Sequence, residues 1–225
     1  IRQTIDSSRI IVSTTASLAT HTAIFSIKHF ELAIIDEASQ ILEPNIIGLL
    51  TAHNKGEQVI DKFILIGDHK QLPAVVQQDN NESAADSPLF EEIHLPNCAN
   101  SLFERLILTE RAAGRTDFVG TLRKQGRMHP DIAAFPNTYF YEREQLECVP
   151  LAHQTEPNLP YNEPSEDPFD DFLKAHRMVF IPSKSCRKPY ISEKVNTEEA
   201  RIVADLVRRL YRQMGTTFDA QKSIG

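Results

Sequence analysis

The sequence contains few cysteines, and their spacing excludes two kinds of stabilising cross-link. Only three occur among 225 residues, Cys98, Cys148 and Cys186, with no C-x-x-C pair and no histidine cluster beside them. This spacing argues against a structural zinc site and against a disulfide framework, and it is typical of proteins from a reducing compartment. We therefore predict a cytoplasmic protein, with the nucleus as the alternative in a eukaryote.

Long apolar runs and positive net charge are also absent. No run approaches the roughly 18 apolar residues that span a bilayer, and no basic-then-apolar secretory signal opens the chain. The net charge of −7 counts against a protein that binds nucleic acid by general electrostatic attraction. Much of this acidity is local, because residues 150–176 hold six acidic residues and five prolines but a single lysine or arginine. We expect that stretch to be an extended, loop-like insertion, so the net charge says little about the remaining surface.

Two short apolar runs are each followed directly by polar residues. Residues 32–35 precede Asp36 and Glu37, and residues 63–66 precede Gly67 and Asp68. Such runs are typical of strands that are buried on both faces. Ligands of open α/β sheets bind at the carboxyl ends of the strands, so we expect the two acidic segments to share one site. For either Asp alone, capping of the following turn is an equally good explanation.

The remaining pattern alternates strands and helices, which indicates an α/β fold. We predict further strands at residues 9–12 and 178–181, and a domain boundary near residues 118–122. Helices are predicted from Ser101, through a capping box, and from Pro130 up to Pro136.

The helix over residues 197–214 has the clearest signals. Asn196 or Thr197 caps it, acidic residues occupy its first turn, and Gly215 follows its end. Its apolar residues recur every three or four positions and predict a buried stripe: Ala200, Val203, Val207, Leu210 and Met214.

Five segments, in order, resemble motifs of the superfamily 1 helicases, specifically the branch of the nonsense-mediated-decay RNA helicase and its DNA-replication helicase relatives. They are residues 34–40 (I-I-D-E-A-S-Q, similar to a Walker B motif), 65–73 (L-I-G-D-H-K-Q-L-P, the third motif), 101–106, 125–130 (Q-G-R-M-H-P) and 196–200 (N-x-x-E-A). The resemblance implies a RecA-like P-loop NTPase core with parts of two parallel-sheet lobes. Residues 1–120 would be the C-terminal part of the first lobe. Residues 121–225 would be the N-terminal part of the second, with the acidic insertion at 150–176.

The resemblance also implies ATP and Mg²⁺ as cofactors and single-stranded DNA or RNA as partner. Asp36 would hold Mg²⁺, through water, and Glu37 would orient the attacking water. Gln71 would contact the γ-phosphate, and Arg127 would act on the same phosphate as an arginine finger.

Four positions that receive roles from the resemblance also have a simpler explanation. Glu199 would bind the nucleotide, or it is only a helix N-terminal acid. Thr14 and Thr15 would contact the nucleic-acid backbone, or they form an ordinary strand-to-helix turn. Arg127 itself could instead be a salt-bridged surface residue.

The sequence departs from the family pattern in two places. It has no G-x-x-x-x-G-K-[ST] phosphate loop, which the resemblance places before residue 1, so we expect an internal fragment of a longer protein. These 225 residues alone should therefore not hydrolyse ATP at a useful rate. Gly126 stands where the family usually has Tyr, whose ring stacks on the nucleotide base, so base affinity is expected to be weaker. The alternative function is a RecA-like scaffold that binds nucleic acid or protein partners without hydrolysis.

Overall fold

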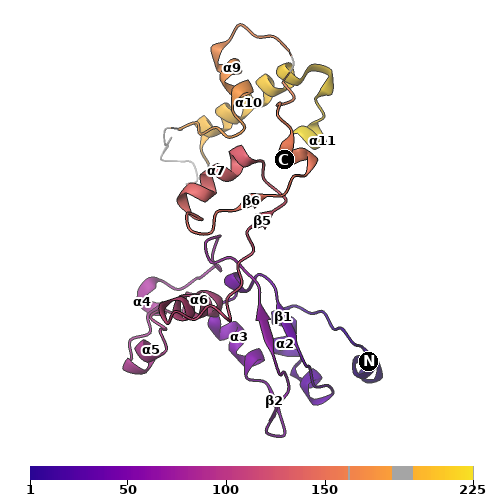
Figure 1. The fold of residues 1–225 in the computed structure, drawn as a ribbon, viewed down its shortest axis with the longest axis vertical. Helices are drawn as coiled ribbons and strands as arrows, with labels where there is room; N and C mark the ends of the chain where they lie inside the picture. The colour runs from indigo at the N-terminus through magenta and orange to yellow at the C-terminus, as the bar shows by residue number, and fades with distance from the viewer. Residues whose placement is uncertain (162, 184–194, 225) are drawn as a thin grey trace. The chain divides into compact units, whose positions relative to one another are not determined.

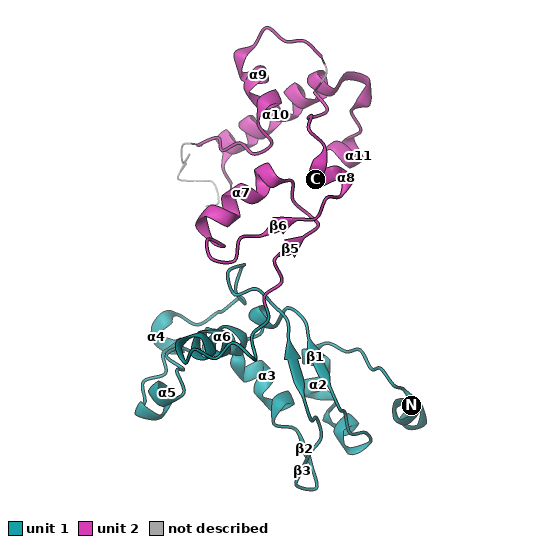
Figure 2. Cartoon of the chain, in the orientation of Figure 1, with its two compact units in different colours: residues 1–120 teal, residues 121–225 magenta. Residues whose placement is uncertain are grey.

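The computed structural model describes residues 1–161, 163–183 and 195–224, and Cys186 lies outside these ranges. The chain forms two compact units, Ile1–Gly120 and Thr121–Gly225 (Figures 1 and 2). In the described ranges every strand pairs within its own unit, so no sheet runs through both. Within those same ranges, no helix has the length and apolar character needed to cross a membrane.

The first unit contains short helices around two pairs of strands. Its elements are α1 (Arg2–Ser7), α2 (Thr15–Thr20), β1 (Ala33–Ile35), α3 (Glu43–Leu50), β2 (His53–Asn54), β3 (Glu57–Gln58), β4 (Phe63–Leu65), α4 (Asn80–Ser83), α5 (Pro88–Glu92) and α6 (Leu102–Ala112), with 3₁₀ turns at Thr22–Ser26 and Ala38–Gln40. The strands β2 and β3 form an antiparallel hairpin across Lys55 and Gly56, which both have positive φ.

The strands β1 and β4 pair in parallel, with Ala33 opposite Phe63 and Ile35 opposite Leu65. On one face Ile35 packs with Ile46 of α3 and Leu102 of α6. The prediction that both strands are buried on two faces is wrong, because Ile34 is 61% exposed and Ile64 46% exposed. Helices α3 and α6 pack on one face of this pair, so successive residues alternate between core and surface.

An ion pair fixes α6 against α3. The Arg105 guanidinium binds both carboxylate oxygens of Glu43, with Nε 2.8 Å from Oε2, and donates to the Ile93 carbonyl at 2.8 Å. Ser101 caps α6 by accepting a hydrogen bond from the Glu104 amide at 3.1 Å. On the outer side of this helix Leu106 is 38% exposed.

Two predicted strands are wrong. Residues 9–12 pair with no strand among the described residues, and Ile10 and Val12 are 82% and 91% exposed. Residues 178–181 are likewise unpaired within the described ranges, and Phe180 is 90% exposed. An apolar run becomes a strand only where a neighbouring backbone supplies hydrogen bonds, and the described residues supply no such neighbour to either run.

The second unit is mainly helical. Its elements are β5 (Lys124–Gln125), α7 (Pro130–Tyr139), β6 (Glu147–Cys148), α8 (Ala152–Thr155), α9 (Pro168–Ala175), α10 (Thr197–Met214) and α11 (Ala220–Ser223), with a 3₁₀ turn at Gly215–Thr217. The strands β5 and β6 pair in parallel, with Gln125 opposite Cys148. The helix α7 continues through Pro136 to Tyr139, so the prediction that Pro136 ends it is wrong. Proline removes only its own donor, and the Phe140 amide still bonds the Pro136 carbonyl at 2.8 Å.

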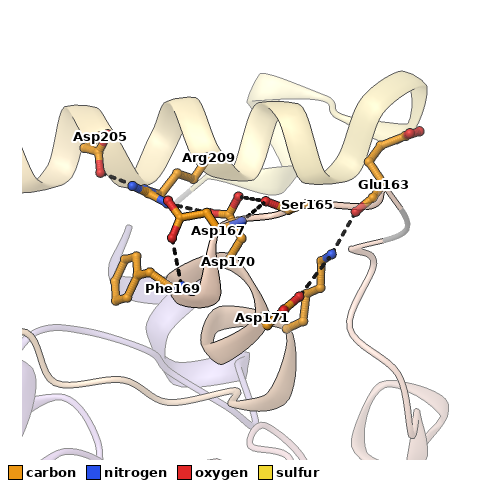
Figure 3. Close-up of polar contacts among 9 residues, drawn as sticks. Glu163, Ser165, Asp167, Phe169, Asp170, Asp171, Asp205 and Arg209 are labelled. Carbon is orange, nitrogen blue, oxygen red and sulfur yellow. Dashed lines mark hydrogen bonds and ion pairs between the residues drawn. The ribbon is translucent and has the colours of Figure 1, made fainter.

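The acidic stretch at 150–176 is not the extended loop that its composition predicts, because it contains α8 and α9. Asp167 caps α9 by accepting from the Phe169 amide at 2.9 Å. Arg209 of α10 then binds Asp167 at 2.6 Å and Asp170 at 2.7 Å (Figure 3). The prolines and acids therefore start and anchor a helix instead of preventing one.

The bounds predicted for α10 are confirmed, with Asn196 as its cap and Gly215 after its end at φ 52°. Its predicted apolar stripe is wrong in part, because Ala200 is exposed and Val203 is 58% exposed. Val207, Leu210 and Met214 of the stripe are half-buried, as are Leu206 and Arg209, and Gln213 is 3% exposed. Because Asp170 of α9 pairs with Arg209, a polar contact as well as apolar packing covers this helix.

Candidate active site

The parallel pairing brings the segments that follow β1 and β4 to the same edge. The Ile66 amide donates to the Ile35 carbonyl, and the Ala38 amide donates to the Ile66 carbonyl, both at 2.8 Å. The acidic turn after β1 and the polar segment after β4 therefore lie side by side. This is the shared edge that the strand order predicts.

Gly67 allows the two segments to touch. A Cβ atom at this position would lie 2.8 Å from the Ser39 amide nitrogen and 3.1 Å from its hydroxyl. The Asp68 amide also donates to Ser39 Oγ at 3.2 Å. Any side chain at position 67 would push the segments apart, so this glycine is required by a close approach of backbone.

The turn after β1 presents two carboxylates at the surface. Asp36 and Glu37 are both exposed. Asp36 Oδ1 accepts from the Glu37 amide at 3.0 Å, and Glu37 Oε2 accepts from Gln40 Nε2 at 3.0 Å. Glu37 has φ 53° and ψ 34°, a left-handed conformation that costs a residue with a side chain about 1–2 kcal/mol. Such strain is concentrated at functional sites, which favours a working role for this acid.

On the neighbouring segment, Asp68 organises the turn. Its Oδ1 accepts from the Lys70 amide and its Oδ2 from Gln71 Nε2, both at 3.0 Å. The turn-capping role that the sequence leaves open for Asp68 is thus present, together with the shared edge. Burial, followed by the charge of Arg111, lowers the pKa of His69 below its usual value.

The residues at this edge fit Mg²⁺ only as a partial ligand set. Among the described residues, no group of three or more His, Cys, Asp or Glu side chains could hold a metal. Asp36 offers one oxygen that its own turn does not use. Because Mg²⁺ keeps several waters and is usually bound by one or two carboxylates plus substrate phosphates, this donor set suits a nucleotide-bound ion.

The other predicted site residues lie on other elements of the two units. Thr14 Oγ1 accepts from the Ser17 amide at 3.1 Å, as the cap of α2. In the second unit, Glu199 Oε1 accepts from Ser183 Oγ at 2.8 Å. Arg127 is exposed, and within the described ranges its guanidinium has no hydrogen bond or ion pair.

Comparison with known proteins identifies the family. Models described as AAA domains match residues 1–79 and 98–225, and the second match alone covers more than half of the chain. The DNA replication ATP-dependent helicase/nuclease of Gallus gallus is 36% identical over 137 residues. The chain belongs to the superfamily 1 helicases. Its α/β architecture with parallel strand pairs is the RecA-like helicase core of that family, so the predicted fold class is confirmed.

This superfamily 1 helicase chain matches only part of each relative. The alignment with the Gallus gallus protein covers 61% of the chain and 11% of that relative. An uncharacterized ATP-dependent helicase of Methanocaldococcus jannaschii is 30% identical over 199 residues, covering 85% of the chain and 26% of the relative. The DNA polymerase alpha-associated DNA helicase A of Saccharomyces cerevisiae is 32% identical, covering 63% and 19%.

Sequence reasoning on this helicase chain gave no role to Ser39, at the shared edge, or to Gln154, beside Arg127. Ser39 lies within the quoted motif but received no role, because its contact with Gly67 joins two segments that are distant in sequence. Gln154 lies in the stretch interpreted as a loop, and no local pattern distinguishes it. Only the tertiary structure shows that it is 1% exposed and bonded to residues around Arg127.

Proposed function

We propose that this protein is an ATP-dependent helicase or translocase that couples ATP hydrolysis to movement on a single nucleic-acid strand. The observation that carries the proposal is the shared edge, where Asp36 and the strained Glu37 lie beside the segment that ends in Gln71. A scaffold has no need for two exposed carboxylates and a strained turn at such an edge.

Asp36 is proposed to bind Mg²⁺ through water, and the ion would neutralise charge on the phosphate oxygens. Glu37 accepts a hydrogen bond from the attacking water and orients it. Gln71 contacts the γ-phosphate without adding charge, because its Nε2 carries two hydrogens and only one is donated to Asp68 Oδ2. These roles match the needs of phosphoryl transfer, which depends mainly on positioning and charge stabilisation.

The second unit is proposed to supply the cation. The Arg127 guanidinium is exposed and has no partner among the described residues, which leaves it available for a phosphate. Glu199 is proposed to help bind the nucleotide, and Thr14 and Thr15 to contact the nucleic-acid backbone. Two of the relatives above carry DNA in their names, which favours single-stranded DNA over RNA.

The units at 1–120 and 121–225 are proposed to belong to the first and second RecA-like lobes. The cytoplasm remains the proposed compartment, with the nucleus as alternative, and a fluorescent fusion protein would test it.

The test of the shared edge uses two charge-removing variants of the full-length protein. Glu37→Gln should abolish hydrolysis while leaving ATP affinity within about threefold, because the amide keeps the shape and loses the charge that orients water. Asp36→Asn should instead weaken binding of Mg²⁺-ATP. Glu31→Gln, the same change at an exposed residue before β1, is the control and should leave turnover unchanged. Near-normal turnover in both site variants would reject the assignment.

The 225 residues alone are proposed to be inactive, because they contain no phosphate loop to hold the nucleotide. Purified chain and full-length protein can be compared for Mg²⁺-dependent ATP hydrolysis. Turnover by the 225 residues that Glu37→Gln abolishes would contradict the proposal. Absence of turnover in the full-length protein, with nucleic-acid binding retained, would favour the scaffold instead.

A further inference from the structure

The backbone around Arg127 is held by a side chain from another element. We call residues 125–128 the arginine loop. Gln154 of α8 donates from Nε2 to the Gln125 carbonyl at 3.0 Å and to the Met128 carbonyl at 2.8 Å. One amide group therefore binds both ends of the loop.

The arginine loop is also bonded internally. Gln125 Oε1 accepts from the Arg127 amide at 2.9 Å and from the Met128 amide at 2.7 Å. Its Nε2 donates to the Met128 carbonyl at 2.8 Å. Next to Gln154, the His153 Nε2 lies 2.9 Å from the Gly126 carbonyl, and because that oxygen can only accept, Nε2 carries the proton.

Within the described ranges, the backbone of Arg127 is held by hydrogen bonds, whereas its side chain is not. Its amide is fixed by Gln125, whereas its guanidinium is exposed and has no partner in the described part of the chain. A guanidinium that must bind the charge developing on a phosphate in one geometry needs a backbone held in place and a side chain without other partners.

Satisfying buried carbonyls does not explain Gln154. The Gln125 carbonyl also accepts from the Val149 amide at 3.0 Å, and the Met128 carbonyl also accepts from Gln125 Nε2. Both carbonyls would remain bonded without Gln154. Meanwhile its own Oε1 is buried and has no hydrogen-bond partner among the described residues, which is unfavourable for folding. The amide cannot be turned over to relieve this, because Oε1 would then face two carbonyl oxygens.

We propose that Gln154 is a positioning residue for phosphoryl transfer, which acts by fixing the arginine loop so that Arg127 reaches the phosphate in one orientation. His153 supports the same loop at Gly126. The proposal rests on the role proposed above for Arg127, and it extends the site to α8, an element outside the motifs that carry the family resemblance.

The first experiment compares two glutamines in the full-length protein. Gln154→Leu removes the loop contacts and keeps an apolar side chain of similar size. Gln213→Leu is the matched control, since Gln213 is 3% exposed and also has a buried Oε1 without a partner, but it lies in α10 away from the loop. Gln154→Leu should lower kcat about 10- to 100-fold with ATP affinity within threefold, as expected for a misplaced catalytic group. Gln213→Leu should keep kcat within threefold, and equal kcat losses in both variants would overturn the proposal.

The second experiment asks whether Gln154 acts through Arg127. In an Arg127→Ala background, Gln154→Leu should cause no further loss of kcat, because the group that it positions is gone. If the double variant lost kcat by the product of the two single losses, the positioning role would be overturned. If Arg127→Ala alone retained turnover, the role of Arg127 and the positioning proposal would both be rejected. If Arg127→Ala abolished turnover while Gln154→Leu left kcat unchanged, only the positioning proposal would be rejected.

A surface variant covers the case in which Gln154→Leu does not fold. His153 is exposed, so His153→Phe removes its bond to the Gly126 carbonyl without disturbing the core. We expect a smaller loss of kcat, about threefold, that disappears in the Arg127→Ala background. An unchanged kcat for His153→Phe would then overturn the proposal.

Discussion

Replacing Arg209 by methionine is expected to destabilise the second unit strongly, because three carboxylates converge on its guanidinium (Figure 3). Nη1 lies 2.6 Å from Asp167 Oδ2 and 2.7 Å from Asp170 Oδ1, and Nε lies 2.7 Å from Asp205 Oδ2. The guanidinium also lies 5.1 Å from the ring centre of Phe169. Methionine keeps an apolar contact with that ring, so the substitution removes mainly the charge.

The stabilisation lost with the Arg209 charge differs between the exposed Asp205 and the buried Asp170. Asp205 has a side chain that is 53% exposed and forms an i,i+4 pair, worth about 0.3–0.5 kcal/mol. Asp170 has a side chain that is only 4% exposed and would keep the bond from Ser165 at 2.6 Å. Removing its cation should therefore cost about 3 kcal/mol, the low end of the range for a broken buried pair. The total of about 3 kcal/mol corresponds to a fall of about 12 °C in Tm for a unit of this size.

Urea titration followed by circular dichroism at 222 nm measures this loss, since the sequence has no tryptophan for fluorescence. Arg212→Met is the matched control on the same helix, because Arg212 is exposed, and it should change the free energy of unfolding by less than about 0.5 kcal/mol. If the two variants differed by less than about 1 kcal/mol, the network would not stabilise the unit as the structure implies.

The pH dependence gives an independent check. Although burial alone raises the pKa of Asp170, hydrogen bonds from Ser165, Arg209 and Gln213 bring it below the usual value. The hydrogen bond from Arg209 likewise lowers the pKa of Asp167. In the wild type these acids therefore add stability that is complete above the unfolded pKa of about 4 and is lost as the pH falls below it. In Arg209→Met, burial has the larger effect on Asp170. The cost of burying its negative charge then lowers stability at neutral pH and disappears when Asp170 is protonated. The difference in free energy of unfolding between wild type and Arg209→Met should therefore become smaller from pH 7 towards pH 4 and below. A difference that does not change with pH would contradict this account.

Three further substitutions test the first unit and the arginine loop. Gly67→Ala should lower the free energy of unfolding by about 1–3 kcal/mol, since its Cβ would lie 2.8 Å from Ser39 N; the control Gly48→Ala, with nothing within 4 Å, should be neutral or stabilising in the same urea titration. Glu37→Gly should stabilise the unit by about 1 kcal/mol, because glycine adopts φ 53° without strain, and it should abolish ATP hydrolysis; a less stable variant would show that the turn is not strained. Gly126→Tyr, at an exposed position where the added Cβ would lie 3.4 Å from Leu151 Cδ1, should tighten ATP binding about tenfold and sharpen discrimination against GTP. Equal affinities of both proteins for both nucleotides would place Gly126 away from the base.

Local signals predicted the elements whose ends are marked by specific residues. The bounds of α10 follow from Asn196 and Gly215, and the strands β1 and β4 follow from their apolar runs. The same kind of signal was present but overlooked for α4, where Asp79 and Glu82 form a full capping box. The prolines of the acidic stretch favoured the prediction of a loop over α9, although Asp167 and Pro168 form an ordinary helix start.

Non-local contacts explain what the sequence did not predict. Periodicity identifies the helix α10, but the ion pair of its Arg209 with Asp170 of α9 joins two segments that no local pattern connects. At the candidate site, the residue types of Asp36, Glu37 and Gln71 are readable from the chain, and their catalytic roles remain predictions. The support from Gln154 could not be read, because it is a contact between segments that no local pattern connects.

The parallel pairing of β1 with β4 also has a consequence for how the chain folds. The helix α3 and the β2–β3 hairpin lie between these strands in the sequence and depend on near neighbours, whereas Ala33 meets Phe63 only after the whole intervening segment has closed. The approach of Gly67 to Ser39 can follow only after that closure. During synthesis, Asp36 and Glu37 therefore remain without their neighbouring segment until Gln71 has left the ribosome, so the site can form only after α3 and the β2–β3 hairpin have emerged.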